Sequence, residues 1–217
     1  NKLFFNNIKS YAEVLDIEAT KDKLVPVLVK IVDEKPKMKI HFLKSLPQFV
    51  DYLCSLGDEG INIIREHIIQ IIEEMYRDKN LFNAELKTLL FDNFIKIAKS
   101  IIPKEKDNYI LDLVLSFGYE SNVSMDFLIE HKKIGIQFIS NLCDTFGQDI
   151  TENYLLPQLW FFAEDDNEEI KKDVLACIPS ICNVLSIDFF GNKIYNLFKK
   201  MSKNKSWQIR KTCIIYI

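Results

Sequence analysis

The side chains that could carry chemistry are spread along the chain and do not gather into known motifs. The histidines His41, His67 and His131 lie far apart, and none has a second ligand at the i+4 spacing of a helical zinc site. We expect them to be ordinary surface or helix-flank residues. Nucleophile-elbow and phosphate-binding glycine motifs are missing from the sequence. The sequence therefore predicts a protein that is not an enzyme and uses no cofactor, although a site assembled from distant segments stays open.

Cysteines and carboxylates are the other candidate ligands. The five cysteines lie among Leu and Ile without a Cys-x-x-Cys pair, which predicts buried reduced thiols: Cys54, Cys143, Cys177, Cys182 and Cys213. The acidic run Glu164–Glu169 lacks the glycine and the final glutamate spacing of an EF-hand loop. Carboxylates are favourable at a helix start because of the helix dipole. We therefore expect no metal site.

Composition restricts the possible partners. The chain has 217 residues, 48% hydrophobic and 27% charged, with a net charge of −3. A weak negative charge predicts no general attraction to nucleic acid or to anionic membranes. The apolar runs are short and interrupted by charges, so no transmembrane helix is expected. We expect a cytoplasmic protein, with the nucleus as a further location.

The elements that must position these residues follow a repeat. Similar amphipathic segments begin at positions 38, 86, 131, 170 and 209. For example, Lys132, Ile139 and Cys143 recur as Lys171, Ile178 and Cys182. Apolar residues within each segment advance by three or four positions. Each segment is therefore predicted to be an amphipathic helix.

Another amphipathic segment precedes each of these helices. We call the preceding segment the first helix of a pair and the helix at the anchor position the second helix. Examples are residues Leu24–Val32 and Leu155–Ala163, in which Pro26 and Pro157 are predicted to lie in the first helical turn. A helix pair about every 40 residues is typical of HEAT or armadillo repeats. The shorter period of tetratricopeptide repeats fits less well. The predicted fold is therefore all-α, a HEAT-repeat α-solenoid of antiparallel helix pairs.

The predicted organisation is one solenoid over residues 1–217 with about five repeats, truncated at both ends. Residues 2–16 are predicted to be the second helix of a preceding repeat. Complete pairs are predicted to end near residues 56, 101, 147 and 186, and a last pair to run from about 187 to 217.

The junctions between the predicted pairs carry a family resemblance. The stretches Leu24–Pro36, Phe146–Leu159 and Lys205–Cys213 resemble repeat junctions of a HEAT-repeat regulatory subunit of protein phosphatase 4. The stretch Glu13–Pro26 and the pair Trp207/Arg210 are similar to scaffold subunits of protein phosphatase 2A. Such proteins usually have Val-Arg at the start of the second helix, and here only Ile209-Arg210 keeps the arginine.

The resemblance implies a non-catalytic scaffold that binds a serine/threonine phosphatase catalytic subunit and other proteins along a ridge of intra-repeat turns. By position, the ridge would include these residues: Asp33, Lys39, Asp165, Asp166, Lys171, Trp207 and Arg210. Neighbouring turn residues such as Glu34, Lys35, Asn167, Lys203 and Lys205 would also line it. No nucleic acid, membrane or metal partner is implied.

Structural roles compete with these binding roles. The Trp207 indole could pack on the preceding turn, and the pairs Asp33/Lys39 and Asp165/Lys171 could form a ladder that ties successive turns together. Another HEAT protein, such as an importin-like adaptor or a part of a large assembly, is the alternative function. A HEAT-like DNA glycosylase is disfavoured because the lysines are distributed over all predicted repeats.

Overall fold

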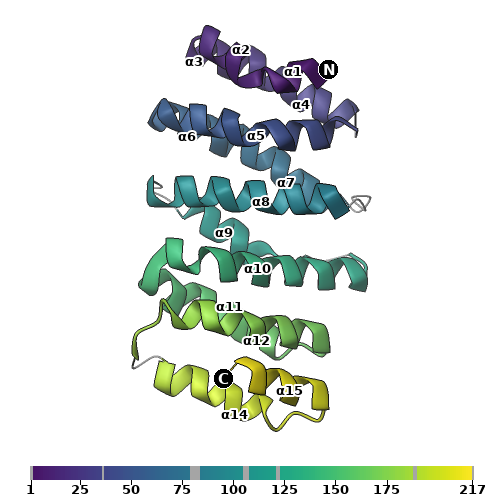
Figure 1. Ribbon diagram of the computed structural model, residues 1–217, viewed down its shortest axis with the longest axis vertical. Helices are drawn as coiled ribbons and strands as arrows, with labels where there is room; N and C mark the ends of the chain where they lie inside the picture. The colour runs from purple at the N-terminus through teal and green to yellow at the C-terminus, as the bar shows by residue number, and fades with distance from the viewer. Residues whose placement is uncertain are drawn as a thin grey trace. The chain divides into compact units, whose positions relative to one another are not determined.

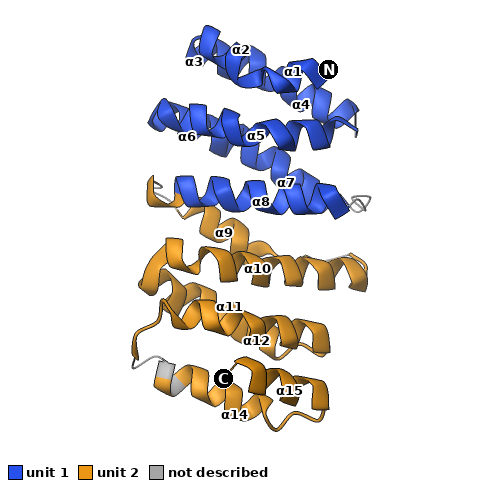
Figure 2. Cartoon of the chain, viewed as in Figure 1, with its two compact units in different colours: residues 1–101 blue, residues 102–217 orange. Residues whose placement is uncertain are grey.

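The computed structural model describes residues 2–35, 37–78, 84–104, 108–120, 123–187 and 190–216, apart from the side chains of residues 190 and 192. The described residues are all-α, without a strand. Their contacts group into two compact units, residues 1–101 and 102–217 (Figure 2). Organisation as one continuous solenoid therefore stays a prediction.

Unit 1 is built from second helices that pack side by side and first helices that pack against them (Figure 1). The helix α5 (Met38–Ser55) contacts α1 (Lys2–Asn6) and α2 (Ile8–Val14) on one flank and α8 (Ala84–Ile101) on the other. One first helix consists of α3 (Ile17–Ala19), the π-helical turn η1 (Thr20–Leu24) and α4 (Val25–Glu34). The next consists of α6 (Asp58–Ile63), the π-helical turn η2 (Ile64–Ile68) and α7 (Ile69–Arg77).

Unit 2 repeats this plan. The second helices α10 (Met125–Ile150), α12 (Glu168–Cys182) and α15 (Trp207–Tyr216) pack in that order. The first helices are α9 (Tyr109–Ser116), which follows the short 3₁₀ helix η3 (Ile102–Lys104), then η4 (Thr151–Leu155) with α11 (Leu156–Ala163), and η5 (Phe190–Ile194) with α14 (Tyr195–Met201). Gly147, with φ of 81°, breaks α10 and lets the next helix start in a new direction.

The observed second helices begin at or before the predicted anchors. The structure starts them at Met38, Ala84, Met125, Glu168 and Trp207. The anchor positions Leu86, Ile170 and Ile209 are all buried. In α12, for example, the first two residues, Glu168 and Glu169, are exposed, because the helix starts before its apolar face meets the core. The predicted helix over residues 2–16 is interrupted at Asn7, between α1 and α2.

The two prolines lie in the first turn of an α-helical segment, as predicted, but not at the start of the whole helix. Pro26 and Pro157 do open α4 and α11, but each lies inside a longer helix and directly follows a π-helical turn. In these turns the Val25 N–H donates to the Thr20 carbonyl and the Leu156 N–H to the Thr151 carbonyl, five residues back. We infer that the wider turn makes room for the proline ring, which would otherwise clash with a carbonyl one turn earlier.

The core lies between first and second helices and is almost entirely aliphatic and aromatic. Each fully buried Leu, Ile or Phe contributes roughly 1.5–3 kcal/mol. Three of the cysteines, Cys143, Cys177 and Cys213, are buried as predicted, whereas Cys54 and Cys182 are half-buried. Burial raises the pKa of Cys177 to about 12, so this thiol stays protonated and unreactive. In the described part of the chain, no helix is long and apolar enough to cross a membrane.

Candidate protein-binding surface on the helix turns

Two turns of unit 2 are closed by the same local device. Before α12, Asp165 Oδ1 accepts the Asn167 N–H at 2.8 Å; before α15, Asn204 Oδ1 accepts the Ser206 N–H at 2.9 Å. Asp165 and Asn204 are as many positions apart in the sequence as the anchors Ile170 and Ile209, as the predicted repeat requires. A side chain that hydrogen-bonds its own backbone two residues on fixes the turn before the helix starts. We call residues 164–169 the acidic turn and residues 199–207 the basic turn.

Lysines at the start of second helices reach forward to the turn of the next pair. The Lys39 Nζ lies 2.9 Å from Asp78 Oδ2, and the Lys132 Nζ lies 2.5 Å from Asp165 Oδ2. The side chains of Lys132 and Asp165 are each 14% exposed. A ladder between successive turns is therefore present, but its rungs are these pairs and not the expected Asp33/Lys39 and Asp165/Lys171 pairs.

Asp165 is held ionised by the contacts around it. Burial raises the pKa of this carboxyl, but hydrogen bonds from Lys132 and the Asn167 amide, with the charges of Lys132 and Lys171, lower it by more. The net pKa is below its ordinary value. The carboxylate thus serves both its own turn and the preceding second helix, which makes it a structural residue first.

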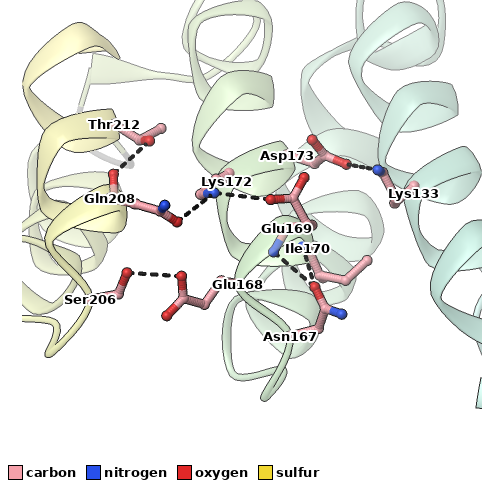
Figure 3. Close-up of polar contacts among 10 residues, drawn as sticks. All are labelled: Lys133, Asn167, Glu168, Glu169, Ile170, Lys172, Asp173, Ser206, Gln208 and Thr212. Atoms are coloured by element: carbon pink, nitrogen blue, oxygen red, sulfur yellow. Dashed lines mark hydrogen bonds and ion pairs between the residues drawn. The ribbon is translucent and has the colours of Figure 1, made fainter.

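Further polar contacts link α12 with α15 and with α10 (Figure 3). Lys172 donates to Glu169 at 2.9 Å and to Gln208 at 3.0 Å, and the Ser206 hydroxyl donates to Glu168 at 2.9 Å.

Figure 3 also shows Asp173 facing Lys133, with 4.0 Å between their charged atoms. Burial raises the pKa of Asp173, and the Lys133 charge offsets only part of that rise. This face of unit 2 therefore satisfies most of its own polar groups.

The second helices of unit 1 are linked by ion pairs of a simpler kind. Lys44 lies 2.6 Å from Glu85, and Lys96 lies 2.9 Å from Asp51. Because these four side chains are about half exposed, each pair contributes little stability, about 0.2–1 kcal/mol. Their effect is to balance the charge on this face.

Trp207 and Arg210 have different roles at the basic turn. Trp207 is the first residue of α15 and stays 61% exposed, so its indole is not packed away on the preceding turn. Arg210 Nη1 donates to the carbonyl oxygens of Asn204 and Lys205, both at 2.8 Å. Arg210 therefore closes the turn, and Trp207 is the side chain left available to a partner.

A second exposed aromatic site was not expected from the sequence. The rings of Tyr119 and Phe161 stack at 5.1 Å between centroids, and each side chain remains about half exposed. The Tyr119 hydroxyl donates to the buried Gln158 at 2.7 Å. The available signal was a glutamine inside the otherwise apolar segment Leu155–Ala163.

The expectation for His131 was wrong. Its ring is 2% exposed and lies against Phe127 and Phe117, with ring centroids 4.0 and 5.4 Å away. Its Nδ1 is 2.5 Å from Glu120 Oε1, while Glu120 Oε2 accepts the Gly118 N–H. Since a buried imidazole needs a polar partner, Glu120 lets the histidine occupy an anchor position.

The remaining expected ridge residues are more exposed to solvent. Asp33 is exposed and lines an open groove of about 490 Å³ beside α4, together with His67 of η2. Asp166 is exposed and Lys171 is half-buried. Over the described ranges, no group of three or more His, Cys, Asp or Glu could hold a metal ion.

The structure thus divides the expected ridge residues into two groups. Lys39, Asp165 and Arg210 are engaged in contacts that hold the fold. Asp33, Asp166 and Trp207 are exposed, and Lys171 lies between the two groups. Comparison with known proteins adds no further assignment: no family model matches the chain, and no curated protein matches it.

Proposed function

We propose that this chain is a non-catalytic HEAT-repeat scaffold whose helix turns bind other proteins. Its principal partner in this proposal is a serine/threonine phosphatase catalytic subunit of the 2A or 4 type. The observation that carries the proposal is the equivalence of the turns. The acidic and basic turns share a closing device at the repeat spacing, and each presents side chains to solvent next to a buried anchor.

A row of equivalent turns suits a scaffold because many modest contacts along an extended surface add up to specific binding. Trp207 supports this role, since an exposed indole beside cations is the composition of an interface hot spot. The choice of a phosphatase partner comes from the resemblance of the junction segments.

The charge balance on the second helices favours this function over an importin-like adaptor. Such an adaptor would hold basic cargo on an acidic inner face. In each unit, a carboxylate on a second helix faces a lysine of a neighbouring second helix, Asp51 with Lys96 and Asp173 with Lys133.

The test is direct binding to purified catalytic subunits of the 2A and 4 types, measured by biolayer interferometry. We expect association with at least one of them. Trp207→Ala should weaken it by about tenfold, the usual effect of truncating an aromatic hot spot. Tyr154→Ala is the matched control, because Tyr154 is an exposed aromatic in η4 and not in a turn.

Failure of both catalytic subunits to bind would reject the phosphatase partner. Equal losses from Trp207→Ala and Tyr154→Ala would reject the turns as the binding surface.

A further inference from the structure

The two turns of unit 2 have opposite charge at equivalent positions. Residues 190–217 contain six Lys and one Arg but no Asp or Glu, whereas residues 164–169 contain five acidic residues and no basic one. In the register that aligns Ile170 with Ile209, Glu164 corresponds to Lys203, Asp166 to Lys205 and Glu168 to Trp207. Lysines occur in all predicted repeats, but at these equivalent positions they stand where the preceding repeat has carboxylates.

The basic turn is available to a ligand. Lys199, Lys203, Lys205 and Trp207 are all exposed. In the part of the chain that the structure describes, Lys203 and Lys205 have no side-chain ion pair. Lys200, by contrast, is bound to Glu164. The ammonium groups of Lys203 and Lys205 and an exposed indole therefore belong to one short segment.

We infer that the basic turn binds an acidic segment of a partner protein. Lys203 and Lys205 would pair with carboxylates of that segment, and the Trp207 indole would cover one of its apolar side chains. Arg210 positions the turn by holding its carbonyl oxygens. This inference rests on the proposed scaffold function and assigns a partner chemistry to one of its turns.

Contacts with the preceding helix pair hold the basic turn rigidly. Ser206 donates to Glu168 and Lys172 donates to Gln208, so the basic turn is tied to α12 on both sides of Trp207. Buried Ile209 anchors the first turn of α15. A turn held in this way loses little conformational entropy on binding, which makes its contacts more effective.

The neighbouring acidic turn argues against a nucleic acid as the occupant. A nucleic acid backbone needs cations along several phosphates, typically as a stripe or groove. Here, contacts of Glu164 with Lys200 and of Glu168 with Ser206 place carboxylates directly beside the basic turn. A short acidic peptide can pair with Lys203 and Lys205 without extending over those carboxylates.

The probe is a short fluorescein-labelled peptide of Asp, Glu, Leu and Phe, measured by fluorescence anisotropy at low salt with the whole chain. We expect the double variant Lys203→Glu/Lys205→Glu to weaken binding by more than about tenfold, and Trp207→Ala by about tenfold. A neutral peptide with Asn and Gln in place of the acids should bind at least tenfold more weakly.

The matched control is Lys23→Glu/Lys99→Glu, which makes the same change of net charge on two exposed lysines of unit 1. It should change the affinity by less than about twofold. Circular dichroism and thermal melting of each variant establish that it is folded. Lys203→Gln/Lys205→Gln removes the two positive charges without introducing negative ones, and it should also weaken peptide binding. This variant tests whether the loss of binding arises from the lost lysine charges and not from misfolding caused by the new glutamates.

Three results would overturn the inference. These are no binding of the acidic peptide, equal losses in the turn and control variants, or tighter binding of a single-stranded oligonucleotide of matched charge. The peptide assay contains no phosphatase, so its outcome is independent of the catalytic-subunit test. Peptide binding without phosphatase binding would keep the acidic-segment site and reject only the phosphatase partner.

Discussion

The acidic and basic turns of unit 2 are two versions of one structure. Both precede a second helix, both are closed by an Asx side chain that accepts a backbone N–H, and both are followed by a buried isoleucine, Ile170 or Ile209. They differ in the closing residue itself. Asp165 also binds the half-buried ammonium of Lys132, whereas Asn204 is neutral. The comparison shows that the turn geometry needs an Asx residue and an apolar anchor, while charge is free to serve another purpose.

The same comparison separates a structural turn from a recognition turn. Lys132 reaches forward to Asp165, but Lys171, its equivalent in the next repeat, would face the neutral Asn204. Within the described ranges Lys171 makes no ion pair. The acidic turn therefore uses its charge to hold neighbouring helices together. The basic turn uses Lys200 for a contact with Glu164 but leaves Lys203 and Lys205 to solvent and to a partner.

The largest effect is expected from removing the carboxylate of the acidic turn. Asp165→Ala leaves the half-buried Lys132 ammonium without this partner and the Asn167 N–H without this acceptor. We expect a loss of about 2–3 kcal/mol in the free energy of unfolding, measured with urea. A loss below about 0.5 kcal/mol would contradict the structural role given to this turn.

The equivalent substitution in the basic turn should cost less. Asn204→Ala removes the acceptor of the Ser206 N–H but, unlike Asp165→Ala, leaves no half-buried lysine without a carboxylate. We expect a loss of about 1 kcal/mol in the same urea experiment. Equal costs for Asp165→Ala and Asn204→Ala would show that the Asx bond, and not the ion pair, dominates both turns.

Acid should remove the advantage of the acidic turn. Because the folded-state pKa of Asp165 lies below its ordinary value, its contribution is present above about pH 4 and is lost as pH falls through the folded-state pKa. Asp165→Asn keeps a turn acceptor but has no charge. We expect it to be about 1 kcal/mol less stable than the native chain at pH 7 and nearly equal to it near pH 2. A deficit that is independent of pH would exclude the charge as its cause.

Converting the basic turn into the acidic type should give a small gain. Asn204→Asp keeps the Asx acceptor and supplies a carboxylate where Lys171 can reach forward. We expect an increase of about 0.5 kcal/mol in stability at neutral pH, which salt should screen. Acidic-peptide binding should fall at the same time, because the new carboxylate repels the ligand. A gain in peptide affinity would contradict the division of roles.

The smallest effect on stability is expected for Trp207→Ala. Since the indole is 61% exposed, its removal should change the unfolding free energy by less than about 0.5 kcal/mol. The thermal melting curve measures this directly. A large loss would mean that Trp207 holds the turn, and the tenfold loss of binding predicted for this variant would then need a structural explanation.

Sequence reasoning located the second helices because burial is periodic. Apolar side chains spaced by three and four residues record the face that meets the core, and Leu86, Ile170 and Ile209 are buried where that pattern places them. The same pattern predicted Trp207 in a turn, whereas the structure makes it the first residue of α15, directly after the turn. It failed for His131, because a polar residue type can occupy a core position when a partner such as Glu120 is supplied from another segment.

The sequence by itself therefore determined the helical class, the approximate starts of the second helices and the turn positions, since these depend on local periodicity and local turn chemistry. Only the tertiary structure decided which charged side chains form ion pairs within the protein. Lys132 and Asp165 are distant in the sequence, and their contact exists because α12 packs beside α10. Whether a lysine binds its neighbour or stays free for a partner depends on such packing, which no local pattern records.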